Sequence, residues 1–272
     1  MTPGELGGTP MSSQSMIGMP KSARQALWLW VTFFCLALVL NGTLPFATGS
    51  DLHRWTYSRA KDVLFGLVLY GGLFMAGPIL LVKDRTVVRR PGFWVPLVLG
   101  VAALGARALF RPSALVALLV LGYLHLRYDL SSLGVRFPSR ARDVAAVTFL
   151  GLLPLTVGGL PPPPSSWDPN AALRAGLDRL LLNPASTTEN LFYFGLLAER
   201  LGPWAGRWGT PLVIGALYTA HEMSNPEYWY ESMNFAIVFV GVALTTMVYL
   251  WSRNSVAIWL SSGLARFVTR LW

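Results

Sequence analysis

Charged residues are scarce in this sequence. Only 13% of the 272 residues are Asp, Glu, Lys or Arg, and 53% are hydrophobic. A soluble domain usually carries about 25% charged residues, and the mean hydropathy of +0.48 points the same way. A deficit of this size across a whole chain excludes an ordinary soluble domain. The composition predicts an all-α fold, a polytopic bundle of transmembrane helices.

Cysteine is almost absent, and acidic residues are outnumbered by basic ones. The single cysteine, Cys35, excludes an intrachain disulfide and a CxxC metal site. The net charge is +9, but the basic residues lie in short loops between apolar runs, where retention on the cytoplasmic side explains them. With no RNA-binding motif and no polybasic tail, nucleic acid is not an expected partner, whereas the lipid bilayer is.

Apolar runs fill most of the chain after residue 24. A spanning helix needs about 20 mostly apolar residues. We expect eight or nine spans in the cell membrane, as a multi-pass protein of a bacterial inner membrane. The candidate spans are 26–46, 63–82, 93–109, 113–126, 144–160, 189–201, 211–221, 235–251 and 256–271. Residues 1–24 are predicted to be a disordered cytoplasmic tail, and residues 25–272 a single transmembrane domain.

The loops predict an orientation. Segments 83–90 and 127–142 are basic and should be cytoplasmic together with the N-terminus. Segment 161–183 then lies on the outer side, where residues 171–182 should form a short amphipathic helix at the interface. Arg54, Arg59 and Lys61 also fall outside, against the charge rule. The sequence leaves open whether Arg111-Pro112 marks a turn between two helices or a kink within one.

Two ionisable residues, Glu189 and His221, adjoin apolar segments in positions that suggest chemistry. A simpler interpretation makes Ser186 and Glu189 a capping box at a helix start and His221 a structural residue at a helix end. A carboxylate near an imidazole can also share a water, take a proton from it and return the proton to a leaving group. Both interpretations remain open at this point.

The motifs around these residues resemble those of the CAAX prenyl protease and bacteriocin-processing family of intramembrane proteases. That family carries Glu-Glu-x-x-x-Arg, then Phe-x-x-x-His, then His-x-x-x-Asn. Glu189-Asn190-Leu191-Phe192-Tyr193-Phe194 stands in the place of the first motif, and Leu217-Tyr218-Thr219-Ala220-His221 in the place of the second. The resemblance covers residues 127–270, with 143–272 as the protease core, and implies that Glu189 and His221 are catalytic.

The chain departs from the family pattern at several positions. Asn190 replaces the second Glu and Phe194 replaces the Arg, so both members of an internal ion pair are lost together. The third motif is missing, because its His and Asn positions fall on Gly263 and Phe267. A shift by one residue gives Ser262 and Arg266 instead. The residues expected to support catalysis are therefore Asn190, Ser261, Ser262 and Arg266.

The resemblance implies a glutamic-type intramembrane endopeptidase that cleaves a membrane-anchored peptide or C-terminal segment. We expect no cofactor and no metal, since one Glu and one His are too few for a catalytic zinc, which takes about three protein ligands. Two alternatives remain. One is a catalytically inactive pseudoprotease that binds a membrane partner. The other is a small proton-coupled transporter, although the sequence has no inverted repeat. The sequence assigns no oligomeric state.

Overall fold

Helices make up the structure wherever it is described. The computed structural model describes residues 19–42, 59–157, 168–224 and 234–271, and these ranges contain no strand. The all-α fold class is therefore confirmed. The elements are α1 (Lys21–Gly42), η2 (Phe65–Ala76), α3 (Gly77–Val82), α4 (Arg85–Val88), α5 (Pro91–Ala106), α6 (Ser113–Tyr128), η3 (Ser131–Leu133), α7 (Ala141–Val157), α8 (Pro169–Leu181), α9 (Pro184–Glu189), η4 (Asn190–Ala198), α10 (Glu199–Met223), α12 (Phe235–Ser252) and α13 (Ser255–Leu271).

Three helices are long and apolar enough to cross a membrane. They are Lys21–Asn41, Arg59–Val82, which contains η2 and α3, and Phe235–Ser252. Helices α5 and α6 are also apolar but have only 16 residues each. Helix α1 begins at Lys21, so the last four residues of the predicted tail, 21–24, are helical. Residues 1–18 of that tail lie outside the described ranges.

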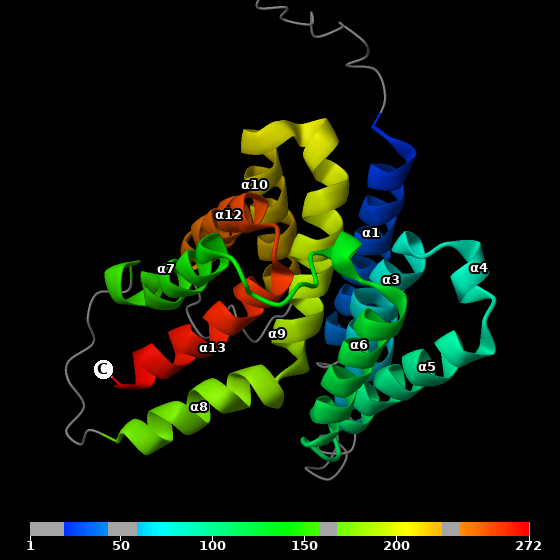
Figure 1. Ribbon diagram of the computed structural model, residues 1–272, viewed down its shortest axis with the longest axis horizontal. Helices are drawn as coiled ribbons and strands as arrows, with labels where there is room; N and C mark the ends of the chain where they lie inside the picture. Colours follow the sequence, from blue (N-terminus) through cyan, green and yellow to red (C-terminus); the bar gives the residue numbers. More distant parts are fainter. Residues whose placement is uncertain (1–18, 43–58, 158–167, 225–233, 272) are drawn as a thin grey trace, which may run out of the picture.

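Turns divide the apolar runs at places that the sequence only partly indicated. Helix α5 ends at Ala106 and α6 begins at Ser113, so Arg111-Pro112 belongs to a turn between two helices. Within α10, Gly206 has a φ of 72°, a left-handed conformation that glycine adopts without a steric penalty. The chain reverses there, and the two arms of α10 run side by side (Figure 1).

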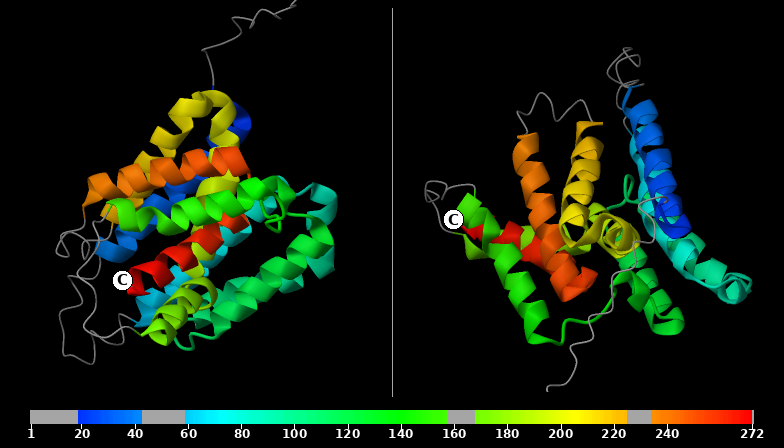
Figure 2. Two further views of the ribbon diagram at one scale, coloured as in Figure 1. Left: turned by 60° about the vertical axis from the view of Figure 1, so that its left-hand side comes forward. Right: turned by 90° about the horizontal axis from the view of Figure 1, so that it is seen from above.

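The helices form two groups with η4 between them (Figures 1 and 2). In one group, α13 packs on α7 and α8 while α12 packs on α10; in the other, α5 packs on α6 and on η2. Every residue of η4 from Leu191 to Ala198 is buried. Both groups contact η4, which places the residue immediately before it, Glu189, between them.

Glycines allow α5 and η2, in the second group, to pack with their backbones close together. A Cβ atom at Gly66 would lie 2.2 Å from the carbonyl oxygen of Leu104, and one at Gly105 would lie 2.4 Å from the Leu67 side chain. Small residues at such contacts let helices pack closely where the hydrophobic effect does not drive them together.

Large apolar side chains cover much of the outside of the bundle. Val95, Leu119 and Leu126 expose 70%, 73% and 80% of their surface. Helices α1, η2 and η4 bury a core of aromatic rings that contact one another, which includes Phe33, Phe74, Phe192 and Tyr193. The molecule is therefore apolar both inside and over wide parts of its surface.

Candidate functional site

Glu189 is a buried carboxylate in the middle of a continuous helical run. It is the last residue of α9, directly before η4, and exposes 8% of its surface. Because α9 already begins at Pro184, Ser186 stands inside the helix and the capping-box interpretation is wrong. The carboxylate instead accepts a hydrogen bond from the Tyr218 hydroxyl, at 3.1 Å between the oxygens.

His221 lies one helical turn after Tyr218 on α10 and is surrounded by aromatic rings. The ring centre of Phe33 is 4.6 Å away in an edge-on contact, and those of Tyr218, Phe74 and Tyr193 are 5.6, 5.9 and 6.0 Å away. The indole N–H of Trp30 donates to the Tyr193 hydroxyl at 3.2 Å, which holds that ring in place. The Nδ1 atom of His221 is buried and has no hydrogen-bond partner.

Glu189, Tyr218 and His221 line one cavity of about 650 Å³. The structure thus brings together the two residues that the sequence singled out, with the ring of Tyr218 next to both. The sequence interpretation missed Tyr218. Its spacing could have revealed it, since residues three apart on a helix share a face and Tyr218 precedes His221 by three.

Charged side chains lie around the Glu189 carboxylate. Arg179 and Arg107 lie close enough to act on it electrostatically, as does Glu222. Arg107 also lines the cavity, where its guanidinium carbon lies 5.7 Å from the ring centre of Tyr70. A buried carboxylate with one hydroxyl partner keeps acceptor positions for a further donor, such as a water.

The predicted supporting residues divide between two places. Asn190, Ser261 and Ser262 line a second cavity of about 660 Å³, which Glu189 and Tyr218 also line. The two serines donate their hydroxyl hydrogens to carbonyls of their own helix, Ser261 to Ile258 at 2.6 Å and Ser262 to Trp259 at 2.7 Å. The two serines therefore line a cavity that does not include His221, and their protons are already engaged.

Arg266 does not line either cavity that contains Glu189. Its side chain is exposed and lines a third cavity of about 1200 Å³, beside Arg270 and α8. The reason is helical geometry. Arg266 follows Ser262 by four residues, about one turn further along α13, and this turn lies against α8 and away from η4. The prediction that Arg266 supports Glu189 directly is therefore corrected.

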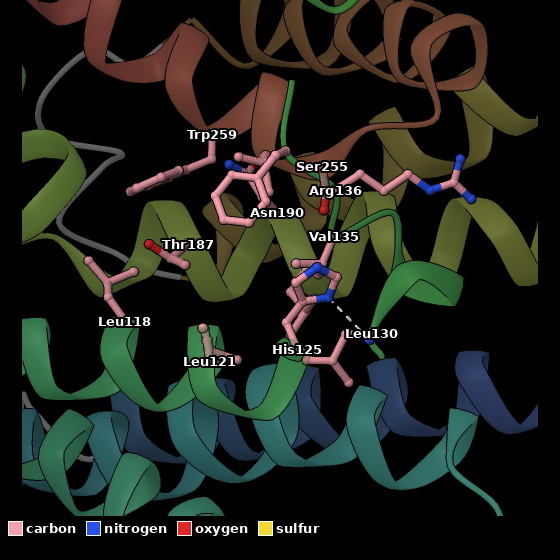
Figure 3. A pocket seen from close by; sticks show the side chains of 14 residues that line it. Leu118, Leu121, His125, Leu130, Val135, Arg136, Thr187, Asn190, Ser255 and Trp259 are labelled. Atoms are coloured by element: carbon pink, nitrogen blue, oxygen red, sulfur yellow. Dashed lines mark hydrogen bonds between the residues drawn. The ribbon is translucent and has the colours of Figure 1, made fainter. Parts of the chain in front are cut away.

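Asn190 also borders an apolar groove on its other side (Figure 3). This groove of about 260 Å³ lies between α6 and α13, and its polar atoms include the buried, unpaired Thr187 Oγ1 and Trp259 Nε1. His125 stands at its edge, where its Nδ1 accepts the backbone N–H of Leu130 at 3.2 Å. The groove has room for an apolar chain, which would contact Asn190, the residue directly after Glu189.

Nothing among the described residues brings three His, Cys, Asp or Glu side chains together as ligands for a metal ion. Comparison with known proteins adds no further assignment: the chain matches no protein-family model, no curated protein and no solved structure.

Proposed function

We propose that the chain is a multi-pass protein of the cell membrane with eight or nine spans. Three helices with the length and apolarity of spans support this, and so do two shorter apolar helices. The exposed leucines, valines and tryptophans on the outside of the bundle also support it, because lipid covers such a surface at no cost whereas water does not. In this arrangement the basic segments 83–90 and 127–142 face the cytoplasm.

Within this membrane protein, Glu189 serves as the base of a glutamic-type endopeptidase. The single observation that carries this proposal is the buried Glu189 carboxylate, bonded to Tyr218 at 3.1 Å, in one cavity with His221. Glu189 takes a proton from a water, and the resulting hydroxide attacks the scissile carbonyl carbon. Glu189 then gives that proton to the leaving amine as the carbon–nitrogen bond breaks.

Tyr218 and His221 stabilise the oxyanion, the role assigned to the missing third motif in the family that the sequence resembles. Developing charge on the carbonyl oxygen needs donors that are already in place. The Tyr218 hydroxyl can turn from Glu189 toward that oxygen, and His221 carries a buried ring nitrogen without a partner. Asn190 lines the second cavity that Glu189 also lines.

The substrate class is suggested by the apolar groove and the second cavity, which both include Asn190. A membrane-anchored peptide or C-terminal segment would lay an apolar stretch in the groove beside Asn190 and present its peptide bond to Glu189. The groove's unpaired Thr187 and Trp259 groups would bond to the backbone of that stretch.

A substrate-trapping experiment tests the proposal. The native protein and Glu189→Gln are each expressed with a photo-crosslinking residue at position 118 in the groove, and the captured membrane proteins are compared. We expect Glu189→Gln to hold intact partners that the native protein yields only as fragments. Asp84→Asn, which makes the same chemical change at an exposed site, should behave as the native protein does.

A non-catalytic binding protein is the second candidate. It is favoured by one observation, that Ser261 and Ser262 donate to their own helix while Arg266 lies in another cavity. The third-motif region therefore brings no charged donor to Glu189. If the chain is a binding protein, the native protein and Glu189→Gln would capture the same intact partner in the trapping experiment.

A further inference from the structure

Arginine side chains from three separate elements gather around one cavity of about 1200 Å³. Arg107 and Arg111 come from the turn between α5 and α6, Arg179 comes from α8, and Arg266 and Arg270 come from α13. Figure 1 shows α8 and the turn joining α5 to α6 toward the same end of the molecule. Segments far apart in the sequence thus contribute one kind of side chain to one place.

The cavity carries an excess of positive charge. Two carboxylates, Asp168 and Asp178, line it together with the five guanidinium groups. Asp168 is engaged locally, since its Oδ1 accepts the backbone N–H groups of Asn170 and Ala171 at 2.9 and 3.0 Å, as the cap of α8. Guanidinium groups crowded together repel one another, and an anion bound among them removes that repulsion.

Arg107 gives a second, independent indication of a ligand. Its Nη1 atom is buried without a hydrogen-bond partner, although its carbon lies near the Tyr70 ring. A buried guanidinium nitrogen without an acceptor is costly. Arg107 lines this cavity and also the one that contains Glu189, so a small rotation of its side chain would bring the unpaired Nη1 group to an oxyanion bound there.

We propose that this cavity, the arginine vestibule lined by Arg107, Arg111, Arg179, Arg266 and Arg270, binds a phosphate group. Donors that approach from three elements suit a tetrahedral phosphate with three exposed oxygens better than a flat carboxylate, which accepts one or two forks in its plane. A phosphate monoester or diphosphate also brings about two negative charges, which fits the excess of guanidinium groups.

The phosphate can belong to a soluble compound or to a lipid headgroup, since the chemistry that the arginines recognise is the same. This site does not depend on hydrolysis at Glu189. A protein without any peptidase activity would still bind phosphate here, and Glu189→Gln should retain the binding.

The test is a binding measurement on the full-length protein in phosphatidylcholine nanodiscs. Titration calorimetry with inorganic pyrophosphate measures the soluble source, and the melting temperature with and without phosphatidic acid in the nanodisc measures the lipid source. We expect Arg107→Gln to weaken whichever interaction is found by about tenfold or more, the loss of one charge-assisted hydrogen bond. Arg207→Gln, an equal change of charge at an exposed residue of α10, should leave it unchanged.

Arg107→Lys and Arg111→Gln keep the test decisive if Arg107→Gln does not fold. Lys retains the charge without the planar fork and should bind more weakly than the native protein. The proposal is overturned if neither pyrophosphate nor phosphatidic acid binds, if folded vestibule variants respond as the native protein does, or if succinate binds as tightly as pyrophosphate.

Discussion

At the scale of single residues, two glutamates on one helical run show how surroundings decide what a carboxylate does. Glu199 accepts the Arg253 guanidinium at 2.6 Å and the Tyr249 hydroxyl at 2.8 Å, so its charge is matched and it ties α10 to the end of α12. Glu189 accepts a hydrogen bond from the Tyr218 hydroxyl and lines two cavities. The first carboxylate is structural, and the second is available for chemistry.

Tyr218→Phe removes the hydroxyl that bonds to Glu189 while it keeps the ring that contacts His221. We expect cleavage to fall by about 10²–10³-fold, which is typical of the loss of one oxyanion donor. Stability should fall by about 1–3 kcal/mol because a buried acceptor loses its partner. Turnover and thermal unfolding of the purified protein measure the two effects.

Tyr123→Phe is the matched control. It removes the same hydroxyl from a half-exposed residue of α6 that does not line the cavity of Glu189 and His221. Equal cleavage by Tyr218→Phe and the native protein would exclude Tyr218 from the reaction.

The residues of the site could be predicted in part from the sequence. Glu189 and His221 stand out because ionisable groups are rare in apolar runs, and the structure places both in one cavity. Tyr218 is harder to single out, because a tyrosine in an apolar helix is usually a packing residue and only its spacing of three residues from His221 sets it apart. The sequence left open whether Ser186 caps a helix, because it does not show where that helix starts, and it placed Arg266 beside Glu189 because it does not show which neighbour faces a given turn.

At the scale of elements, the buried helix η4 positions the site by packing tightly against the segment that precedes α7. A Cβ atom at Gly195 would lie 2.5 Å from the backbone carbonyl oxygen of Leu133. Neither backbone can yield without moving η4, which carries Asn190 and directly follows Glu189. The sequence predicted these helices from their apolar runs, but it could not show which glycine makes a close contact.

Gly195→Ala should therefore destabilise the protein by about 1–3 kcal/mol, the usual cost of forcing an extra carbon into a packed interior. Chemical unfolding of the purified protein in detergent measures this. Gly122→Ala is the control, because a Cβ atom there meets nothing within 4 Å and alanine favours a helix over glycine. If both variants unfold at the same denaturant concentration, η4 is not held in place by this contact.

At the scale of the whole molecule, the proposed number and direction of the spans rest on the alternation of apolar helices and basic loops. The sequence predicted the helices well because hydrophobic runs are long and few residues are charged. Helix length was less predictable, because α5 and α6 have only 16 residues each, on either side of a turn that contains a proline.

Cysteine labelling in intact cells tests the orientation. In a Cys35→Ser background, which removes the only natural thiol, Asp84→Cys should react only after the membrane is permeabilised. Asp168→Cys should react with an impermeant maleimide from outside. Labelling of both positions from the same side would contradict the arrangement of spans.

The most direct measurement of the central claim compares new protein N-termini in membranes that contain the native protein or Glu189→Gln. We predict that a set of termini within or beside apolar segments appears with the native protein and with Asp84→Asn. The same termini should fall by about 10²–10⁴-fold with Glu189→Gln, the contribution of a general base, while all three proteins accumulate equally. Identical termini with and without the Glu189 carboxylate would contradict a glutamic-type peptidase.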